Sequence, residues 1–173
     1  TMKRFKNILF VSDNHERGQE AFERAAQLAL RNEAKLTVIG TAKVSALDAL
    51  IGHKTISLGD LQRQLISERS AQLEEAIAAL ELNQLDVSSK VLLGGGFVEV
   101  IQEVLRNAHD LVIKAAESWA GMNTTWFGSS DLHLMRKCPC PVWIMKPTRK
   151  RRYERILAAV DTDPIGEDQD KLN

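Results

Sequence analysis

The chain has 173 residues, with 23 Lys and Arg against 23 Asp and Glu, so its formal net charge is zero. This length allows one domain with a proper core and leaves a remainder too short for a second domain. A neutral chain has no net field that steers it to nucleic acid or to an anionic membrane, so we expect neither as a partner. Any binding has to come from a local site.

Two features of the sequence predict a cytoplasmic protein. No apolar run approaches the roughly 20 residues of a membrane-spanning helix, and the chain starts directly with a basic segment and a strand. Cys138 and Cys140 are separated by one proline, and a disulfide between them would be severely strained, so we expect reduced thiols. His133 lies five residues upstream, but the spacing lacks the Cys-x2-Cys pair typical of zinc sites, and no metal ligand is assigned.

The beginning of the chain predicts a strand, a helix and a second strand. Residues 7–12 form a continuous apolar run, typical of a strand buried on both faces of a parallel sheet. Apolar residues then recur on one helix face from about residue 19 to 32, and residues 35–40 are again strand-like. Asp13 ends the first strand, where doubly wound folds place ligand contacts, but an Asp at this place can equally cap the following turn.

The middle of the chain predicts one long helix and a third strand. Residues 42–59 have no clear period, and apolar residues at helical spacing then predict a helix from about residue 58 to 82. Residues 87–93 have the composition of a strand and are followed by three glycines, 94–96. The glycines match neither a P-loop nor the dinucleotide fingerprint, so we interpret them as a tight turn, with a phosphate contact as the alternative.

The last third of the chain repeats this alternation. A helix from about residue 97 leads to a strand at 110–114, and a loop and a helix then lead to a fifth strand at 141–145. Gly128 and Ser129 begin that helix, where free backbone N–H groups can hold an anion. The pattern predicts a five-stranded parallel α/β sheet with helices on both faces, in Rossmann-like or flavodoxin-like order.

The segment 110–145 resembles the carboxy-terminal signature of the universal stress protein family. In that signature a strand ends in Gly, two residues precede a second Gly, and nine more precede a Gly-Ser or Gly-Thr pair, a helix and a Cys-Pro-Val strand. The register places Ala115 and Ser118 at the first two glycines and Gly128 and Ser129 at the last pair. The resemblance therefore implies a degenerate ATP site, because added Cβ atoms stand where backbone must approach phosphate.

The same resemblance implies a function. An Asp at the end of the first strand lies beside the adenosine in the family, and Asp13 has that position. The expected role is that of a cytosolic stress-response protein that senses a ligand or binds a partner, without enzymatic activity and without a cofactor, although ATP or AMP remain candidate ligands. The alternative is a nucleotide hydrolase or adenylating enzyme with Asp13 and Ser129 at its site.

The sequence shows no coherent set of catalytic residues beside the expected ligand site. The four histidines are scattered, no Gly-x-Ser-x-Gly elbow occurs, and His109 is interpreted as a boundary residue before the fourth strand. The loop before Gly128 carries Trp119, Met122 and Trp126, which either fill the vacated phosphate space or line a pocket for a less polar ligand.

The end of the chain resembles its beginning. Residues 152–161 match residues 4–13 in type at a constant offset of 148 (152 − 4). We therefore expect one universal stress protein domain over 1–147, a basic linker over 148–153 and the truncated start of a second such domain over 154–173. This arrangement resembles the tandem members of the family.

The fifth strand is expected to lie at an edge of the sheet. Residues 141–146 would then present apolar side chains and unpaired backbone groups, which tend to recruit another strand. We expect a two-fold homodimer through this strand, in the place that the second domain takes in a longer tandem chain.

Overall fold

The computed structural model describes residues 4–12, 18–43, 57–80, 82, 84–94, 96–116, 129–146 and 157–158. Strands and helices alternate along these residues, as the sequence predicted. In chain order they are β1 (Asn7–Ser12), α1 (Gly18–Asn32), β2 (Lys35–Ala42), α3 (Leu58–Ala78), β3 (Val87–Leu93), α4 (Phe97–Asn107), β4 (Leu111–Ala115), α5 (Ser129–Lys137) and β5 (Val142–Met145).

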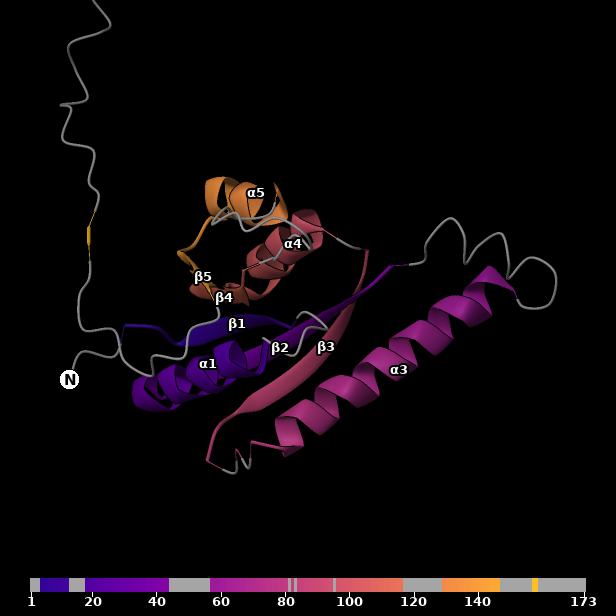
Figure 1. Cartoon of the computed structure of the whole chain (residues 1–173), viewed down its shortest axis with the longest axis horizontal. Helices are drawn as coiled ribbons and strands as arrows, with labels where there is room; N and C mark the ends of the chain where they lie inside the picture. The colour runs from indigo at the N-terminus through magenta and orange to yellow at the C-terminus, as the bar shows by residue number, and fades with distance from the viewer. Residues whose placement is uncertain are drawn as a thin grey trace, which may run out of the picture.

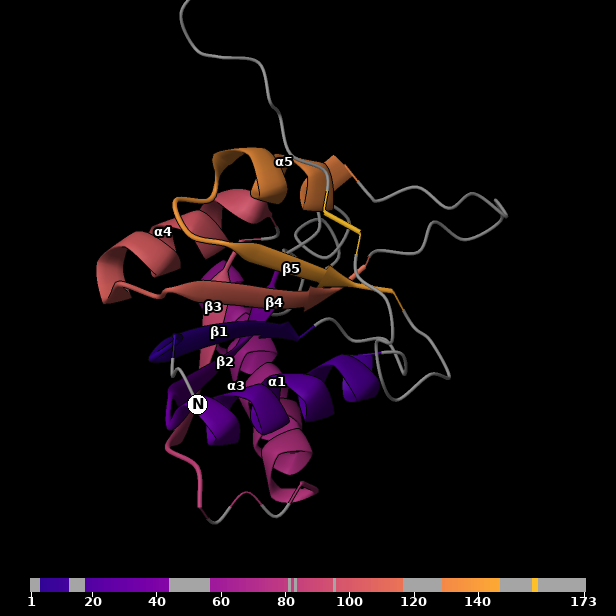
Figure 2. The ribbon, with the colours of Figure 1, turned by 90° about the vertical axis from the view of Figure 1, so that its left-hand side faces the viewer.

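All five strands are parallel and form one sheet in the order β3-β2-β1-β4-β5. This is the Rossmann-type order of the two that the sequence left open. Figures 1 and 2 show α1 and α3 on one face of the sheet and α4 and α5 on the other. The predicted parallel α/β sheet with helices on both faces is therefore confirmed.

The alternation of side chains along β1 divides the core into two layers. Ile8 and Phe10 pack on the α1 face, where the Phe10 ring stacks on Phe22 with centroids 5.1 Å apart. Leu9 and Val11 pack on the face that α4 and α5 cover. All four β1 residues are at most 2% exposed, so β1 is the centre of the sheet, buried on both faces as its continuous apolar run predicted.

Two polar side chains fix the amino end of β1. The Asp110 carboxylate, just before β4, accepts hydrogen bonds from the backbone N–H groups of Lys6 at 2.6 Å and Asn7 at 3.1 Å. The Asn32 side-chain oxygen, at the end of α1, accepts from the backbone N–H of Arg4 at 3.0 Å. These bonds set the position of β1 against its neighbours and satisfy backbone donors that the sheet leaves unpaired.

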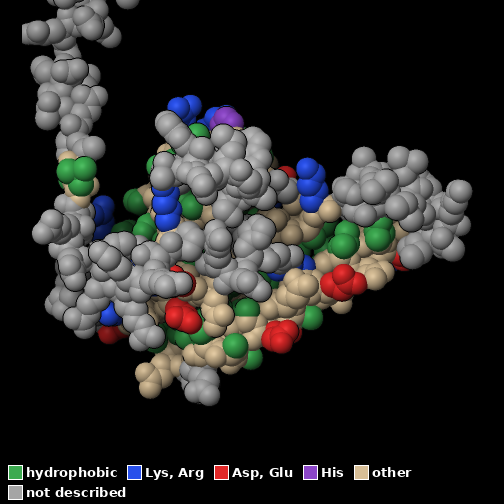
Figure 3. Space-filling view, in the orientation of Figure 1, with side chains coloured by type: hydrophobic (Ala, Val, Ile, Leu, Met, Phe, Trp, Pro, Cys, Tyr) green, Lys and Arg blue, Asp and Glu red, His purple; other side chains and the backbone are tan. Residues whose placement is uncertain are grey.

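The long helix α3 differs from its predicted form. It ends at Ala78, and of the apolar residues that its pattern assigned to the core only Leu73 is buried. Figure 1 shows why, since the first turns of α3 extend beyond the end of the sheet. Arg69, which does not belong to this apolar pattern, is also buried, at 8% exposed. Figure 3 shows acidic side chains spaced along the outer side of this helix.

Among the described residues, no helix has the length and apolar character to cross a membrane.

Candidate functional site

The candidate site is the crevice where the strand order reverses. The chain proceeds from β1 outward to β2 and β3 and then returns to β4 on the other side of β1. After β1 it passes to α1 on one face, and after β4 it passes to α5 on the opposite face (Figure 1). Because the connections diverge, the carboxyl ends of β1 and β4 mark the place where open α/β sheets generally form a ligand-binding crevice.

Two of the five predicted site residues are described. Ala115 ends β4 and is 7% exposed, and its methyl group belongs to the core on the α1 face together with Ile113 and Met145. Ser129 is the first residue of α5 and is exposed. The other three lie outside the described residues: Asp13, Ser118 and Gly128. The three large apolar side chains of the loop, Trp119, Met122 and Trp126, lie outside them as well.

A buried ion pair joins the end of β4 to the start of α5. Lys114 is the penultimate residue of β4 and extends its side chain toward α5, where its Nζ donates to Asp131 Oδ1 at 2.9 Å and to the Ala115 carbonyl at 3.4 Å. Asp131, in the first turn of α5, is 0% exposed, and Lys114 is 5% exposed. The Asp131 carboxylate therefore lies at the positive end of the α5 dipole with a cation beside it.

A second buried cation reaches the end of β1 from the opposite face. Arg69 Nη2 donates to the Ser12 carbonyl at 2.7 Å, and Arg69 Nη1 donates to Gln72 Oε1 at 2.9 Å. The side chain passes directly over Gly40 of β2, where a Cβ atom would lie 2.5 Å from Arg69 Nε. A glycine inside this strand is thus explained by the close approach of Arg69. Arg69 and Lys114 approach the ends of adjacent strands from opposite faces of the sheet.

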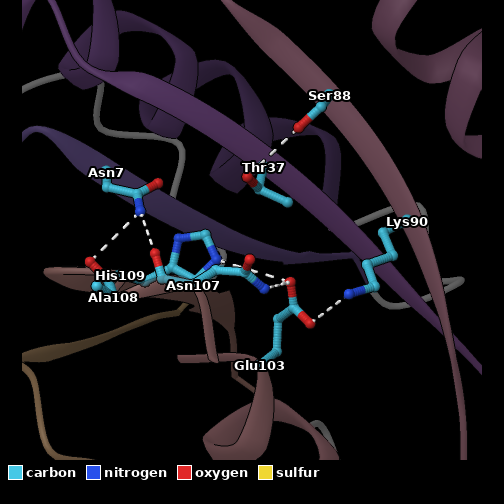
Figure 4. Close-up of polar contacts among 8 residues, drawn as sticks. All are labelled: Asn7, Thr37, Ser88, Lys90, Glu103, Asn107, Ala108 and His109. Atoms are coloured by element: carbon cyan, nitrogen blue, oxygen red, sulfur yellow. Dashed lines mark hydrogen bonds and ion pairs between the residues drawn. The ribbon is translucent and has the colours of Figure 1, made fainter. Parts of the chain in front are cut away.

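A separate polar cluster lies between α4 and the sheet (Figure 4). The Glu103 carboxylate, 2% exposed, accepts from Lys90 Nζ and from Asn107 Nδ2, both at 2.7 Å. His109 Nε2 is 3.8 Å from Glu103 Oε1, and neither ring nitrogen has a hydrogen-bond partner among the residues that the structure describes. Burial lowers the pKa of His109, and the nearby Glu103 carboxylate opposes that shift. The boundary position of His109 is confirmed, but the sequence did not predict its burial.

The sequence did not single out Arg69, Lys114, Asp131 or Glu103, although signals were present for three of them. Lys114 is a charged residue inside an apolar strand, and Asp131 stands where the first turn of the predicted helix falls. Arg69 lies four residues before Leu73, on the same face of α3. Within the described part of the chain, no group of three or more His, Cys, Asp or Glu side chains is placed to hold a metal ion.

Curated relatives share most of this chain. It is 32% identical over 166 residues to universal stress protein E of Escherichia coli (strain K12), which covers 92% of this chain and 51% of that protein. A universal stress protein E homolog of Haemophilus influenzae is 28% identical over 179 residues, covering 98% of this chain and 57% of the homolog. The chain thus spans about half the length of the curated relatives it matches.

Solved structures of low sequence identity share the fold. The universal stress protein UspA from Lactobacillus plantarum aligns with a TM-score of 0.64 at 20% identity, over 82% of this chain and 98% of that one. A universal stress protein in complex with cAMP aligns with a TM-score of 0.62 at 16% identity, over 83% and 99%. The model of the universal stress protein family matches residues 4–146. Fold and sequence agree, and the chain belongs to the universal stress protein family.

Proposed function

We propose that this chain is a non-enzymatic stress-response domain of the cytoplasm that senses a ligand or binds a partner, and that its nucleotide site is degenerate. The observation that carries this proposal is the buried Lys114–Asp131 ion pair beside the crevice. The carboxylate of Asp131 takes up the favourable position for negative charge at the start of α5, and Lys114 supplies its counter-charge. A phosphate arriving at the same helix start would meet a second negative charge close by, which disfavours its binding.

Relatives of this fold do bind nucleotides, as the structures with cAMP and, in an Archaeoglobus fulgidus protein, with dAMP record. For this chain we expect ATP to bind with a Kd above about 100 μM, which corresponds to about −5.5 kcal/mol. Repulsion acts on the phosphates and not on the adenosine. Adenosine should therefore bind no more weakly than ATP, whereas an intact phosphate site would favour ATP strongly.

The experiment is calorimetry of the purified chain with ATP and with adenosine, combined with an assay of phosphate release. The charge argument is tested by Asp131→Asn, which removes the negative charge at the start of α5 and leaves Lys114 in place. Asp86→Asn is the matched control, because Asp86 is an exposed carboxylate paired with Lys35 at 3.6 Å. We expect measurable ATP binding only in Asp131→Asn.

Tight ATP binding by the unchanged protein would contradict the degenerate site. Phosphate release above a blank would contradict the non-enzymatic role and favour the alternative, a nucleotide hydrolase that uses this crevice. Nucleotide recovered from the denatured purified protein by mass spectrometry would count against the proposal in the same way.

Assembly through β5 is the second part of the proposal. β5 is an edge strand, and among the described residues its one strand partner is β4. Its apolar residues Val142, Trp143 and Ile144 are half-buried. We propose that two copies pair through this strand about a two-fold axis, and that the second domain of a longer tandem chain takes the same place. The balanced charge of the chain supports neither nucleic acid nor a membrane as a partner.

A further inference from the structure

Two thiols lie side by side at the end of the sheet where the strands begin, opposite to the end that holds the candidate site. Cys138 follows α5, with its backbone N–H bonded to the Leu134 carbonyl at 2.9 Å, and Cys140 precedes β5 by two residues. Their Sγ atoms are 3.7 Å apart. Both side chains are half-buried against the core layer under α4 and α5, so the pair remains partly accessible to solvent.

We propose that Cys138 and Cys140 form a chelate for one thiophilic metal ion. Two bonds of about 2.3 Å from zinc to sulfur, at a tetrahedral angle, place the two sulfurs about 3.8 Å apart. The observed 3.7 Å needs almost no movement to reach this geometry. A disulfide requires about 2.05 Å between the sulfurs, so the pair is much closer to a chelate than to a disulfide.

The electrostatic surroundings favour a bound cation over free thiolates. The Asp110 carboxylate lies near Cys140, and Cys138 directly follows the carbonyl end of α5. A metal ion displaces the thiol protons when it binds, and the carboxylate and the carbonyl end of α5 that oppose a thiolate both attract a cation.

The chelate has open coordination positions. The imidazole of His133 stacks on the Phe97 ring of α4, with centroids 4.8 Å apart, so this histidine is committed to another contact. No third protein ligand joins the two sulfurs among the described residues. An ion held by two thiolates alone exchanges readily, which suits the capture of soft metal ions such as cadmium or copper(I) and not a structural zinc site.

The direct test is titration of the fully reduced chain with Cd2+. We expect one ion per chain, a thiolate-to-cadmium charge-transfer absorption in the ultraviolet, and proton release on binding. These readouts need no substitution. The absence of the absorption band, or a ratio of one ion to two chains, would overturn a chelate formed within one chain.

Serine variants then identify the ligands. Cys138→Ser and Cys140→Ser should each weaken Cd2+ binding at least about 100-fold, because each removes one of two thiolates. His133→Gln is the matched control and should leave binding unchanged. Binding that survives in both serine variants would overturn the assignment. The mass of wild-type protein purified without reductant is a second check. A mass lower by two hydrogens would also overturn the assignment, since the two cysteines would then form a disulfide.

Discussion

Two ion pairs in this molecule each join a lysine to a buried carboxylate, but the exposure of the lysine differs. In the pair at the crevice, the side chains of Lys114 and Asp131 are 6% and 0% exposed. In the pair under α4, the Lys90 side chain is 47% exposed while Glu103 is 2% exposed. The first pair joins the two elements that border the crevice, and the second holds a helix against an edge strand. Loss of one partner therefore has different consequences at the two places.

The difference follows from solvent access. Lys114 and Asp131 are both buried, so solvent does not stabilise one of these charges when the other is removed. Breaking such a buried pair costs about 3–5 kcal/mol. Lys90 can turn into solvent, so Glu103 and Lys90 are not equivalent partners.

Removal of Lys114 should have the largest effect on stability. Lys114→Met leaves the fully buried Asp131 carboxylate without its cation and should lower the free energy of unfolding by about 3–5 kcal/mol in urea titrations. The double variant Lys114→Met with Asp131→Leu should recover most of the loss, because no charge is then left buried. If the free energy of unfolding of Lys114→Met lies within about 1 kcal/mol of that of the unchanged protein, the pair is hydrated in solution.

Removal of Glu103 should cost less, and removal of Lys90 less again. Glu103→Leu removes the buried carboxylate that accepts hydrogen bonds from Lys90 Nζ and Asn107 Nδ2 and should cost about 1–3 kcal/mol, because hydrogen bonds to a charged group are lost. Lys90→Ala should cost at most about 1 kcal/mol, because its side chain is half-exposed. The same urea titrations measure both variants, and equal losses would mean that the two residues act only as a pair.

The cluster under α4 should also make stability depend on pH. The pKa of His109 is lowered by burial from its ordinary value of 6.5, so the folded chain resists protonation. Below pH 6.5 the unfolded chain then binds more protons, and the free energy of unfolding should fall until the pH passes the folded pKa. His109→Leu should reduce the difference between unfolding at pH 7.5 and at pH 5.5, and an unchanged difference would rule out His109 as its source.

The two edge strands of the sheet, β5 and β3, are expected to differ in their tendency to pair with another copy of the chain. β5 presents Trp143, whereas β3 carries Lys90, a charge that discourages strand pairing at an edge. Trp143→Lys should shift the dimer toward monomer in sedimentation at tens of micromolar, because it places two charges near the axis. Ser88→Lys, on the edge strand β3, is the matched control. A monomeric unchanged protein would contradict the proposed dimer, and a dimer lost only in the control would place the interface elsewhere.

The smallest effect is expected from restoring the family's glycines. Ala115→Gly with Ser118→Gly should raise the affinity for ATP by no more than about tenfold, or about 1.4 kcal/mol, since the Ala115 methyl group packs in the core. Asp131→Asn should have the larger effect, and calorimetry compares the two directly. If the glycine variant binds ATP more tightly than Asp131→Asn, steric exclusion and not charge closes the site.

The alternation of elements follows from local sequence patterns. Short apolar runs rich in β-branched residues and bounded by polar residues predicted β1 and β4, because strands buried on both faces of a parallel sheet have this composition. The same pattern and the resemblance both place the expected crevice near Ala115 and Ser129, and this position stays a prediction. The three other predicted site residues fall outside the described part of the chain, and their roles stay predictions.

The burial of particular charged side chains depends on contacts between segments that are distant in the sequence. Arg69 meets the carbonyl of a residue 57 positions away, and Lys114 meets a carboxylate 17 positions away. Periodicity counts a charged side chain as exposed, whereas a guanidinium that donates to a distant backbone carbonyl can be buried. Such pairing depends on which strand ends meet across the sheet, and a local pattern in the sequence does not contain that information.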